Sequence, residues 1–249
     1  MPWTWAAATC RGTSHARAGT RCQDQAACVT LGPSASTLLA IVSDGAGSAS
    51  FGGQGAALVC RSIITRARAH FRDSAVLPTE AEAWTWVDDA RDRIAVAATR
   101  RNIERREFAA TLVAVIIGDD GGLILHVGDG AAVVKMGDVW LSPSWPESGE
   151  YASTTFFVTE DPAPQLRLTR IESAERVAVF SDGLERLILD FAHKEPHAPF
   201  FERMFGPVEG SERVGKDKEL TAALRRYLDS APVNERTDDD KSLILAFVR

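Results

Sequence analysis

The fold is decided by the stretch Val177-Ala178-Val179-Phe180-Ser181-Asp182-Gly183-Leu184, in which a short apolar run is followed by one serine and then an aspartate. The β-branched and aromatic residues of this run predict a strand from Val177 to Phe180. An Asp-Gly pair most often forms the turn of a β-hairpin, but the residues after Gly183 follow a helical pattern and no strand returns. A turn therefore does not explain Asp182, and we expect its side chain at the edge of a sheet.

Four other aspartates are candidates for the same edge. Asp44 follows the apolar run Leu38 to Val42. The others lie in the segments Arg-Cys-Gln-Asp, Val-Gly-Asp and Thr-Asp-Asp-Asp, at Asp24, Asp129 and Asp239. Strands of one sheet end at a common edge, so these carboxylates can meet there as hard oxygen ligands for Mg²⁺ or Mn²⁺. Two carboxylates about 4 Å apart repel by roughly 4 kcal/mol at an effective dielectric constant near 20, so such a cluster takes up protons or metal ions.

One further Asp-Gly pair has a simpler explanation. Asp120-Gly121 lies between two apolar, β-rich runs, Phe108 to Ile117 and Leu123 to Val127. This arrangement is typical of a hairpin turn. We therefore expect Asp120 to have no part in metal binding.

Six short motifs carry a family resemblance. Arg-Cys-Gln-Asp, ending at Asp24, is similar to an Asn-Glu-Asp motif, and Val42 to Gly45 is similar to a hydrophobic-x-Asp-Gly motif. Ala110-Thr111-Leu112 resembles Gly-Thr-Thr and is followed by a Gly-Asp motif, and Ser181 to Leu184 reads Ser-Asp-Gly-Leu. The last motif, Asp239 to Ser242, resembles Asp-Asn-x-Ser/Thr. In this order, from Gly12 to Val248, the motifs resemble the metal-dependent serine/threonine protein phosphatases of type 2C, in their bacterial single-domain form.

The resemblance implies a fold and a reaction. The fold is α+β, a four-layer α-β-β-α sandwich of two antiparallel sheets flanked by helices, and short strands in series with long helices favour the same architecture. The reaction is hydrolysis of phosphoserine and phosphothreonine on proteins, in which a hydroxide that bridges two Mn²⁺ or Mg²⁺ ions attacks phosphorus. The implied partner is a phosphorylated protein, opposed by a serine/threonine kinase.

The resemblance also implies a role for each site residue. Asp44 bridges the two ions, Asp182 and Asp239 bind the first, and these three are the expected catalytic residues. The carbonyl group of Gly45 and a water held by Asp24 complete the coordination of the second ion. Asp129 pairs with Asp182 at a weaker third metal site.

Two departures from the family pattern affect substrate binding. The usual phosphate-binding arginine lies five residues before the first-motif aspartate, and that position is Gly19 here. Arg17 and Arg21 lie two residues to either side and are candidate replacements; His15, in a Gly-Thr-Ser-His prefix found in a bacterial subgroup, is a third. The stretch 137–164, where many bacterial members have a helical flap, is too rich in proline and glycine for a long helix.

Two other functions stay open on the sequence. The missing arginine at Gly19 is compatible with a pseudophosphatase that binds phosphoproteins or acts as a regulatory module. The metal ligands alone are also compatible with a metal-dependent hydrolase of small phosphate esters or nucleotides. Assays with and without Mn²⁺ separate the three functions.

The composition is typical of a single enzyme domain over residues 1–249. We expect the protein to be a monomer. The chain is 45% hydrophobic, and its formal net charge of −6 at 25% charged residues gives no indication of nucleic-acid binding. Cys10, Cys22, Cys28 and Cys60 lack Cys-x-x-Cys spacing and are expected to be free thiols in a reducing compartment. No membrane span or signal peptide is expected, so we expect a cytoplasmic protein.

The residue pattern also predicts individual elements. Strands are expected at Thr4 to Thr9, Ala26 to Leu31, Leu38 to Val42, Phe108 to Ile117, Leu123 to Val127, Ala132 to Met136, Val139 to Leu141, Thr155 to Thr159, Leu166 to Ile171, Arg176 to Phe180 and Ser242 to Val248. Helices are expected at Gly53 to Phe71, Glu80 to Arg106, Gly183 to Leu189, Pro199 to Phe205 and Asp217 to Leu228. The stretches 206–218 and 229–238 are expected to be flexible.

Overall fold

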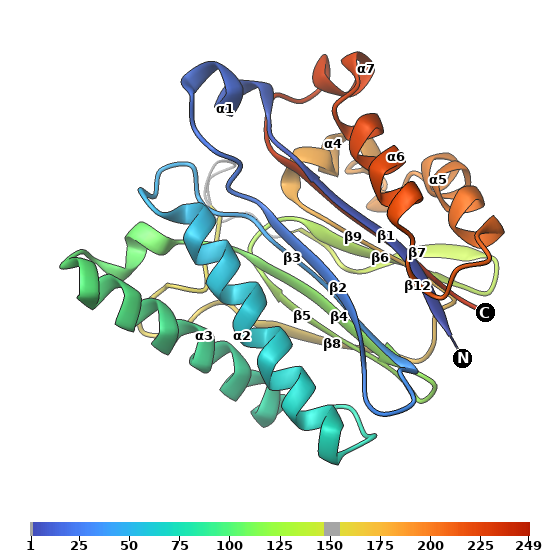
Figure 1. Ribbon diagram of the computed structural model, residues 1–249, viewed down its shortest axis with the longest axis horizontal. Coiled ribbons are helices and arrows are strands. Elements are labelled where there is room, and N and C mark those ends of the chain that lie inside the picture. Colours follow the sequence, from blue (N-terminus) through green and yellow to red (C-terminus); the bar gives the residue numbers. More distant parts are fainter. Residues whose placement is uncertain (1, 147–154) are drawn as a thin grey trace.

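Two β-sheets packed face to face form the centre of the molecule in a computed structural model, which describes residues 2–146 and 155–249 (Figure 1). Within these residues the larger sheet has the strand order β12-β1-β13-β9-β6-β7 and the smaller has the order β2-β3-β4-β5-β8. The larger sheet comprises β1 (Trp3–Cys10), β6 (Ala131–Met136), β7 (Val139–Ser144), β9 (Arg176–Phe180), β12 (Gly215–Lys216) and β13 (Lys241–Val248). The smaller comprises β2 (Gln25–Leu31), β3 (Thr37–Ser43), β4 (Leu112–Gly118), β5 (Gly121–Val127) and β8 (Arg167–Ile171).

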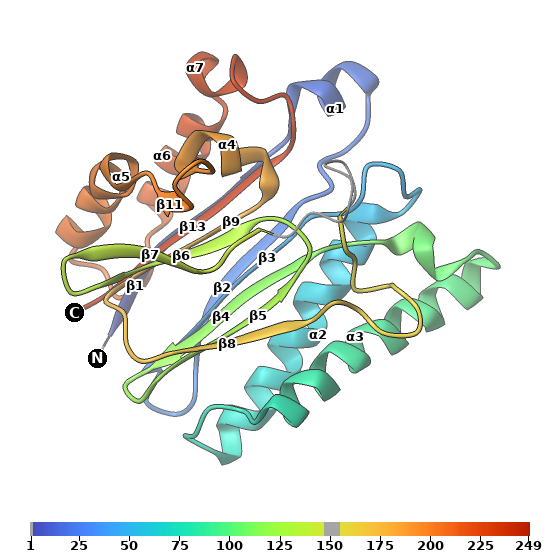
Figure 2. The ribbon, with the colours of Figure 1, turned by 180° about the vertical axis from the view of Figure 1, so that it is seen from behind.

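Helices cover the outer face of each sheet, so the expected four-layer α-β-β-α sandwich is confirmed (Figure 2). α2 (Gly52–Asp73) and α3 (Glu80–Arg101) lie on the smaller sheet, and α5 (Ala198–Gly210) and α6 (Lys218–Leu228) lie on the larger. The short helices are α1 (Thr13–Ala18), α4 (Glu185–Ile188) and α7 (Ala231–Asn234), and the short strands β10 (Leu189–Asp190) and β11 (Glu195–Pro196) form a separate ribbon. The sheets are antiparallel as expected, apart from the β1–β12 pair, which is parallel.

The central strands are buried on both faces, which explains their continuous apolar sequence. In β3, Leu38, Ala40 and Val42 pack in the core between the sheets. The alternate residues Leu39 and Ile41 pack in the core beneath α2 and α3. Strand periodicity thus assigns each residue to one of two cores. A third core lies between the larger sheet and the helices α5 and α6.

The second long helix is shorter than the sequence predicted. α3 starts at a capping box, in which the Thr79 hydroxyl accepts from the backbone N–H of Glu82. It ends at Asn102, which adopts the left-handed conformation with φ 54°, a common way to terminate a helix. Arg105–Phe108 then forms a separate 3₁₀ helix, so β4 begins at Leu112 and not at Phe108.

Several other local predictions are wrong, among them the flexible stretch 229–238, in which α7 forms. The helix α1 was not predicted, because its six residues bury no apolar face. The segment predicted as a strand from Thr155 to Thr159 contains an isolated bridge at Thr155 and a turn at 158–159. The stretch 206–218 is more ordered than expected, because α5 continues to Gly210 and the Asp217 side chain accepts from Ser211 Oγ at 2.7 Å while it caps α6. The predicted absence of a long helix in 137–164 partly concerns residues 147–154, which lie outside the described residues. In the described part of this stretch, β7 is the regular element.

The strand register brings the ends of several strands to one edge of the sandwich. Ser43 at the end of β3 pairs with Gln25 at the start of β2, and Phe180 at the end of β9 pairs with Ala131 at the start of β6. This edge lies next to α1, while both chain termini lie at the opposite end (Figure 1). Among the helices of the described residues, none is both long and apolar enough to cross a membrane.

Candidate metal centre

Three of the predicted aspartates come together at this edge. One carboxylate oxygen each from Asp44, Asp129 and Asp182 lies within 4.8 Å of the other two. Asp44 directly follows β3, Asp129 lies between β5 and β6, and Asp182 follows β9 after one residue, Ser181. The site therefore draws on both sheets, as expected for residues delivered by strand ends.

Asp24 borders this group and is buried, at 8% exposed. Its Oδ2 accepts a hydrogen bond from Ser181 Oγ at 2.7 Å, and Ser181 Oγ in turn accepts from the Ser242 N–H at 2.9 Å. Its Oδ1 is buried and has no hydrogen-bond partner among the described residues, and the same is true of Asp129 Oδ1. Two unsatisfied buried carboxylate oxygens at one site are costly unless a cation binds them.

Burial and mutual repulsion raise the pKa values of Asp24, Asp44 and Asp182. Burial raises the pKa of Asp24 to about 6. The pKa of Asp44 is raised well above its usual range. Burial is the largest cause, and the charges of Asp24 and Asp182 come next. Burial, followed by the charges of Asp129 and Asp239, does the same to the pKa of Asp182. A divalent cation would remove this repulsion, so the residues present fit a metal site of hard oxygen donors.

Asp239 lies beside the group of three and not within it. It is half-buried, and its Oδ1 accepts from the backbone N–H of Asp240 at 2.8 Å. Its charge contributes to the raised pKa values of Asp182 and Asp129. The structure thus places Asp239 close enough to act electrostatically on the site.

Glycines allow the loops of the site to pack closely. A Cβ atom at Gly45 would overlap the backbone of Gly52, and one at Gly183 would overlap the carbonyl oxygen of Asp240. Each Asp-Gly motif therefore needs its glycine for a close backbone contact. The Asp44 backbone is held from the other side, because its N–H donates to Thr111 Oγ1 at 3.0 Å.

Asp240 is a site residue whose role the sequence did not reveal. It is 1% exposed and accepts from the backbone N–H groups of Gly12 and Gln23, both at 2.6 Å. His15 Nδ1 lies 2.9 Å from Asp240 Oδ2. The motif position was interpreted as an asparagine equivalent, but its carboxylate ties together the loops that carry His15 and Asp24.

Thr155 and Glu185 were also missed. Thr155 Oγ1 donates to Asp129 Oδ2 at 2.5 Å, and nothing in the local sequence distinguishes this threonine. Glu185 Oε1 accepts from the Gly130 N–H at 2.5 Å, and burial followed by the charge of Asp129 raises the pKa of Glu185 to about 7. Its place three residues after Asp182, in the turn that leaves the strand, was an available signal.

The three candidate phosphate ligands occupy different environments. His15 is in contact with buried Asp240 and its side chain is 19% exposed. Arg17, in α1, donates to Asp238 Oδ2 at 3.1 Å from a side chain that is 71% exposed. Arg21 is exposed in the loop between α1 and β2. Of the three, His15 is the one that the structure anchors to a buried residue of the site.

Comparison with known proteins agrees with this site and fold. The sequence profile of the family described as Protein phosphatase 2C matches residues 11–229. Serine/threonine-protein phosphatase 3 of Escherichia coli (strain K12) is 35% identical over 254 residues, which cover 99% of this chain and 98% of that protein. The chain therefore belongs to the protein phosphatase 2C family. It is a metal-dependent protein phosphatase by class, as the motif order predicted.

Solved structures show the same fold at low sequence identity. The catalytic domain of the serine threonine protein phosphatase PstP, in complex with two manganese ions, superposes with a TM-score of 0.69 at 14% identity and covers 99% of this chain and 98% of that chain. PppA, described as a key regulatory component of T6SS in Pseudomonas aeruginosa, has a TM-score of 0.69 at 16% identity, with 99% and 98% covered.

The raised pKa values predict that the metal-free protein loses stability as the pH rises. A carboxyl group with a raised pKa in the folded state binds more protons folded than unfolded, so its stabilising contribution is complete below the unfolded pKa of about 4 and is lost as the pH passes the folded pKa. The folded values of about 6 for Asp24 and about 7 for Glu185 place this loss between roughly pH 4 and 7.

Thermal unfolding in EDTA and in saturating Mn²⁺ checks this prediction. In EDTA, the Tm at about pH 8 should be lower than at about pH 5, because the carboxylates then repel one another. Mn²⁺ should raise the Tm more at the higher pH, since the ion competes with protons for the same oxygens. A Tm increase with Mn²⁺ that is equal at both pH values would contradict the assignment of these carboxylates as ligands.

Proposed function

We propose that this protein hydrolyses phosphoserine and phosphothreonine on proteins in a reaction that depends on Mn²⁺ or Mg²⁺. The convergence of Asp44, Asp129 and Asp182 within 4.8 Å carries the proposal. Membership of the protein phosphatase 2C family supports the reaction class. The names of its relatives, including serine/threonine-protein phosphatase 3, support the choice of phosphorylated side chain.

The residues that would hold the ions follow from the family motifs and the geometry. We assign Asp44 as the ligand shared by two ions, with Asp182 and Asp239 on the first and the Gly45 carbonyl group and Asp24 on the second. Asp129, with Asp182, would hold a third. When bound, the ions would supply an activated water near neutral pH and offset charge on the phosphoryl group. The PstP structure, which is in complex with two manganese ions, supports the proposal that this site holds manganese.

The protein itself positions these groups. Thr111 holds the Asp44 backbone, and Ser181 orients the Asp24 carboxylate. Thr155 holds one oxygen of Asp129, and the other, Oδ1, accepts no hydrogen bond from the described residues. Asp240 fixes the loop before Asp24. Preorganisation of this kind lets the site stabilise developing charge without reorganising.

Phosphate capture without the usual arginine is assigned to the segment 15–21. A charge-assisted hydrogen bond to phosphate is worth about 1.5–3 kcal/mol, so Ala at the residue that contacts phosphate should lower kcat/KM for a phosphothreonine peptide by roughly 10-fold or more. We expect the largest loss for His15→Ala, because Asp240 holds His15 in place, and smaller losses for Arg17→Ala and Arg21→Ala.

Steady-state kinetics of the three variants and their triple mutant test this assignment. Mn²⁺ affinity, measured in parallel, should hardly change, because none of the three is a proposed ligand. Should the triple mutant keep the wild-type kcat/KM, the segment has no role in phosphate binding.

The proposal extends to the cellular setting. A serine/threonine kinase would supply the phosphoprotein substrate, and we propose a monomer that acts in the cytoplasm. No nucleic-acid partner is proposed, in keeping with the net charge of −6.

One set of assays tests the proposed function against its alternatives. Turnover of p-nitrophenyl phosphate, a phosphothreonine peptide and a series of nucleotides is measured with Mn²⁺, with Mg²⁺ and in excess EDTA. We expect metal-dependent hydrolysis of the first two. Hydrolysis of nucleotides alone would support a small-ester hydrolase, and binding of the phosphopeptide without turnover would support a pseudophosphatase.

A further inference from the structure

A cavity of about 510 Å³ opens among the short helices on the outer side of the larger sheet. Its walls come from α4, α5, the end of α6, and α7 (Figure 1). This volume lies in the range of typical ligand pockets, which are mostly apolar and carry a few polar groups. The proposed metal centre does not use the cavity, except that Leu184, two residues after Asp182, is part of its wall.

The surface of the cavity is largely apolar and accessible. Leu187, Phe200 and Met204 are half-buried in its wall, and Tyr227 is 40% exposed. A second cavity of about 170 Å³ shares Met204, Tyr227 and Arg203 with the first and continues between α5 and α6. The two neighbouring cavities are hereafter called the α5–α7 groove. Aromatic residues and methionine in such a groove are typical of protein-binding surfaces.

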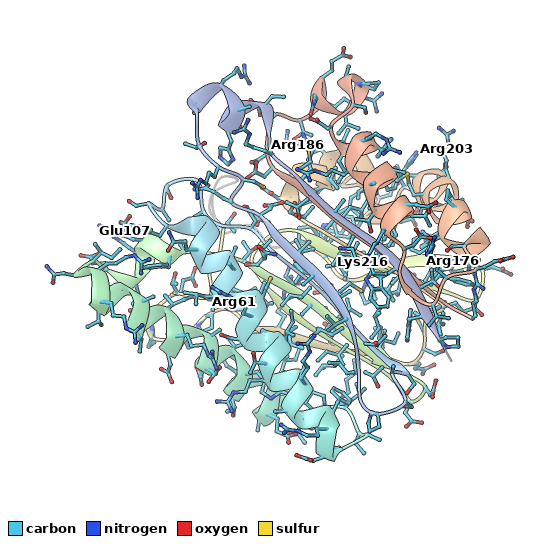
Figure 3. All side chains as sticks on the ribbon, viewed as in Figure 1. Arg61, Glu107, Arg176, Arg186, Arg203 and Lys216 are labelled. Atoms are coloured by element: carbon cyan, nitrogen blue, oxygen red, sulfur yellow. The ribbon has the colours of Figure 1, made fainter. Side chains whose placement is uncertain are left out.

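The charge of the groove is opposite to that of the protein as a whole. The residues that line the larger cavity, all of them in the described part of the chain, include Arg203, Arg236 and His197 but no aspartate or glutamate. The chain itself carries 34 acidic and 28 basic residues. Arg203 projects from α5 at the surface of the molecule (Figure 3).

Arginines on the opposite helical layer are of both kinds, paired and unpaired. Arg66 and Arg93 bind Asp89, whereas Arg61 and Arg68 form no ion pair among the described residues. Within residues 2–146 and 155–249, no ion pair is formed by Arg203 or Arg236. An unpaired arginine at the rim of an apolar groove can bind a carboxylate in a bidentate way.

We propose that the α5–α7 groove is a docking site for the protein substrate, and that it binds a peptide segment with apolar side chains flanked by aspartate or glutamate. The proposal rests on the proposed phosphatase function. Leu184, in the wall of the groove, follows Asp182 by two residues, so one polypeptide could place its phosphorylated residue at the metals and a neighbouring segment in the groove. The second contact would raise the effective concentration of the phosphorylated residue at the site.

Synthetic substrates test the docking site. Each contains one phosphothreonine and a tail joined by a Gly/Ser linker, which is made in several lengths because an extended chain spans about 3.3 Å per residue. One tail alternates glutamate with leucine and phenylalanine, a second replaces each glutamate by lysine, and a third has serine throughout. With wild-type enzyme, kcat/KM for the acidic apolar tail should exceed that for the serine tail by about 10-fold.

Charge reversal should remove this advantage. In Arg203→Glu/Arg236→Glu, the ratio of kcat/KM between acidic and serine tails should fall to about one, while the lysine tail should gain. Each variant is normalised to its own turnover of p-nitrophenyl phosphate. The matched control is Arg61→Glu/Arg68→Glu, which makes the same charge change on exposed residues of α2. Arg61 lies on the other helical layer (Figure 3). It should keep the wild-type ratio.

Direct binding separates this proposal from the catalytic one. A fluorescein-labelled acidic apolar tail without phosphothreonine should bind wild-type protein and the control variant, and bind the groove variant at least about 10-fold more weakly. This result would hold even if no phosphopeptide were hydrolysed. Equal kcat/KM for all tails, or an acidic-tail advantage that persists in Arg203→Glu/Arg236→Glu, would overturn the docking site. Equal binding of the acidic and lysine tails would show that the arginines have no role in it.

Discussion

Asp44→Asn is expected to abolish Mn²⁺-dependent turnover of p-nitrophenyl phosphate while the protein stays folded. Asp44 is one of the three clustered carboxylates, and its pKa is raised by burial and by the charges of both Asp24 and Asp182. Asparagine keeps the shape of the side chain but removes the charge that a shared ligand would supply to two ions. Loss of a charge-stabilising element in a preorganised site typically costs about 10²–10³ in kcat, and loss of a shared ligand should cost at least as much.

The same substitution should stabilise the protein when no metal is present. At neutral pH the metal-free wild type must keep buried carboxylates close together, and Asp44→Asn removes one of them. Its Tm in EDTA should therefore be higher than that of the wild type, while its Tm increase with Mn²⁺ should be smaller. Full activity in Asp44→Asn, or in the wild type in excess EDTA, would refute a metal mechanism. A lower Tm in EDTA would show that the carboxylate stabilises the fold in some other way.

The elements that the sequence predicted well are those whose pattern reflects burial. β3 and β9 are continuous apolar runs because both of their faces are covered, and α2 and α3 bury one stripe each. Burial of this kind is visible in residue order, since it depends on strand and helix periodicity. The architecture followed, because short antiparallel strands and long helices have few ways to cover their apolar faces.

The parts that were missed depend on contacts between distant segments. α1 buries no residue, and its place is fixed by Asp240, more than 200 positions away in the chain, through Gly12. Thr155 reaches Asp129 by a single hydroxyl group. Such contacts leave no periodic pattern, because one side chain is enough to make each of them.

Within the site, too, residues placed by strand ends were predicted, and residues placed by contacts between distant segments were not. Asp44, Asp129 and Asp182 were predicted to meet because each follows or lies between strands that end at one edge. Asp240 occupies a motif position but was not expected to bind two backbone N–H groups. Its role became visible only when the loops at Gly12 and Gln23 were seen to converge on it.

Asp182→Ala and Asp239→Ala are each expected to lower kcat by more than about 100-fold, whereas Asp120→Ala should cost little activity. Asp182 belongs to the group of three, and Asp239 acts on that group through its charge. Asp120 lies in the two-residue turn between β4 and β5, as predicted from its Asp-Gly sequence, where Gly118 pairs with Gly121. β5 separates this turn from the metal centre by seven residues, or about 23 Å at roughly 3.3 Å per residue.

Asp120→Ala is therefore the matched control for the two ligand variants, since it removes the same charged group from the smaller sheet, at the end of β5 that lies away from the metal centre. The measurement is kcat at saturating Mn²⁺, together with the Mn²⁺ concentration at half-maximal activity. A ligand variant should need more Mn²⁺ as well as turn over more slowly, because both the affinity and the position of the ion depend on the missing oxygen. A wild-type Mn²⁺ requirement in Asp239→Ala would leave Asp239 as a charge beside the site and not a ligand, and equal losses in all three variants would mean that the turn at Asp120 had been misassigned.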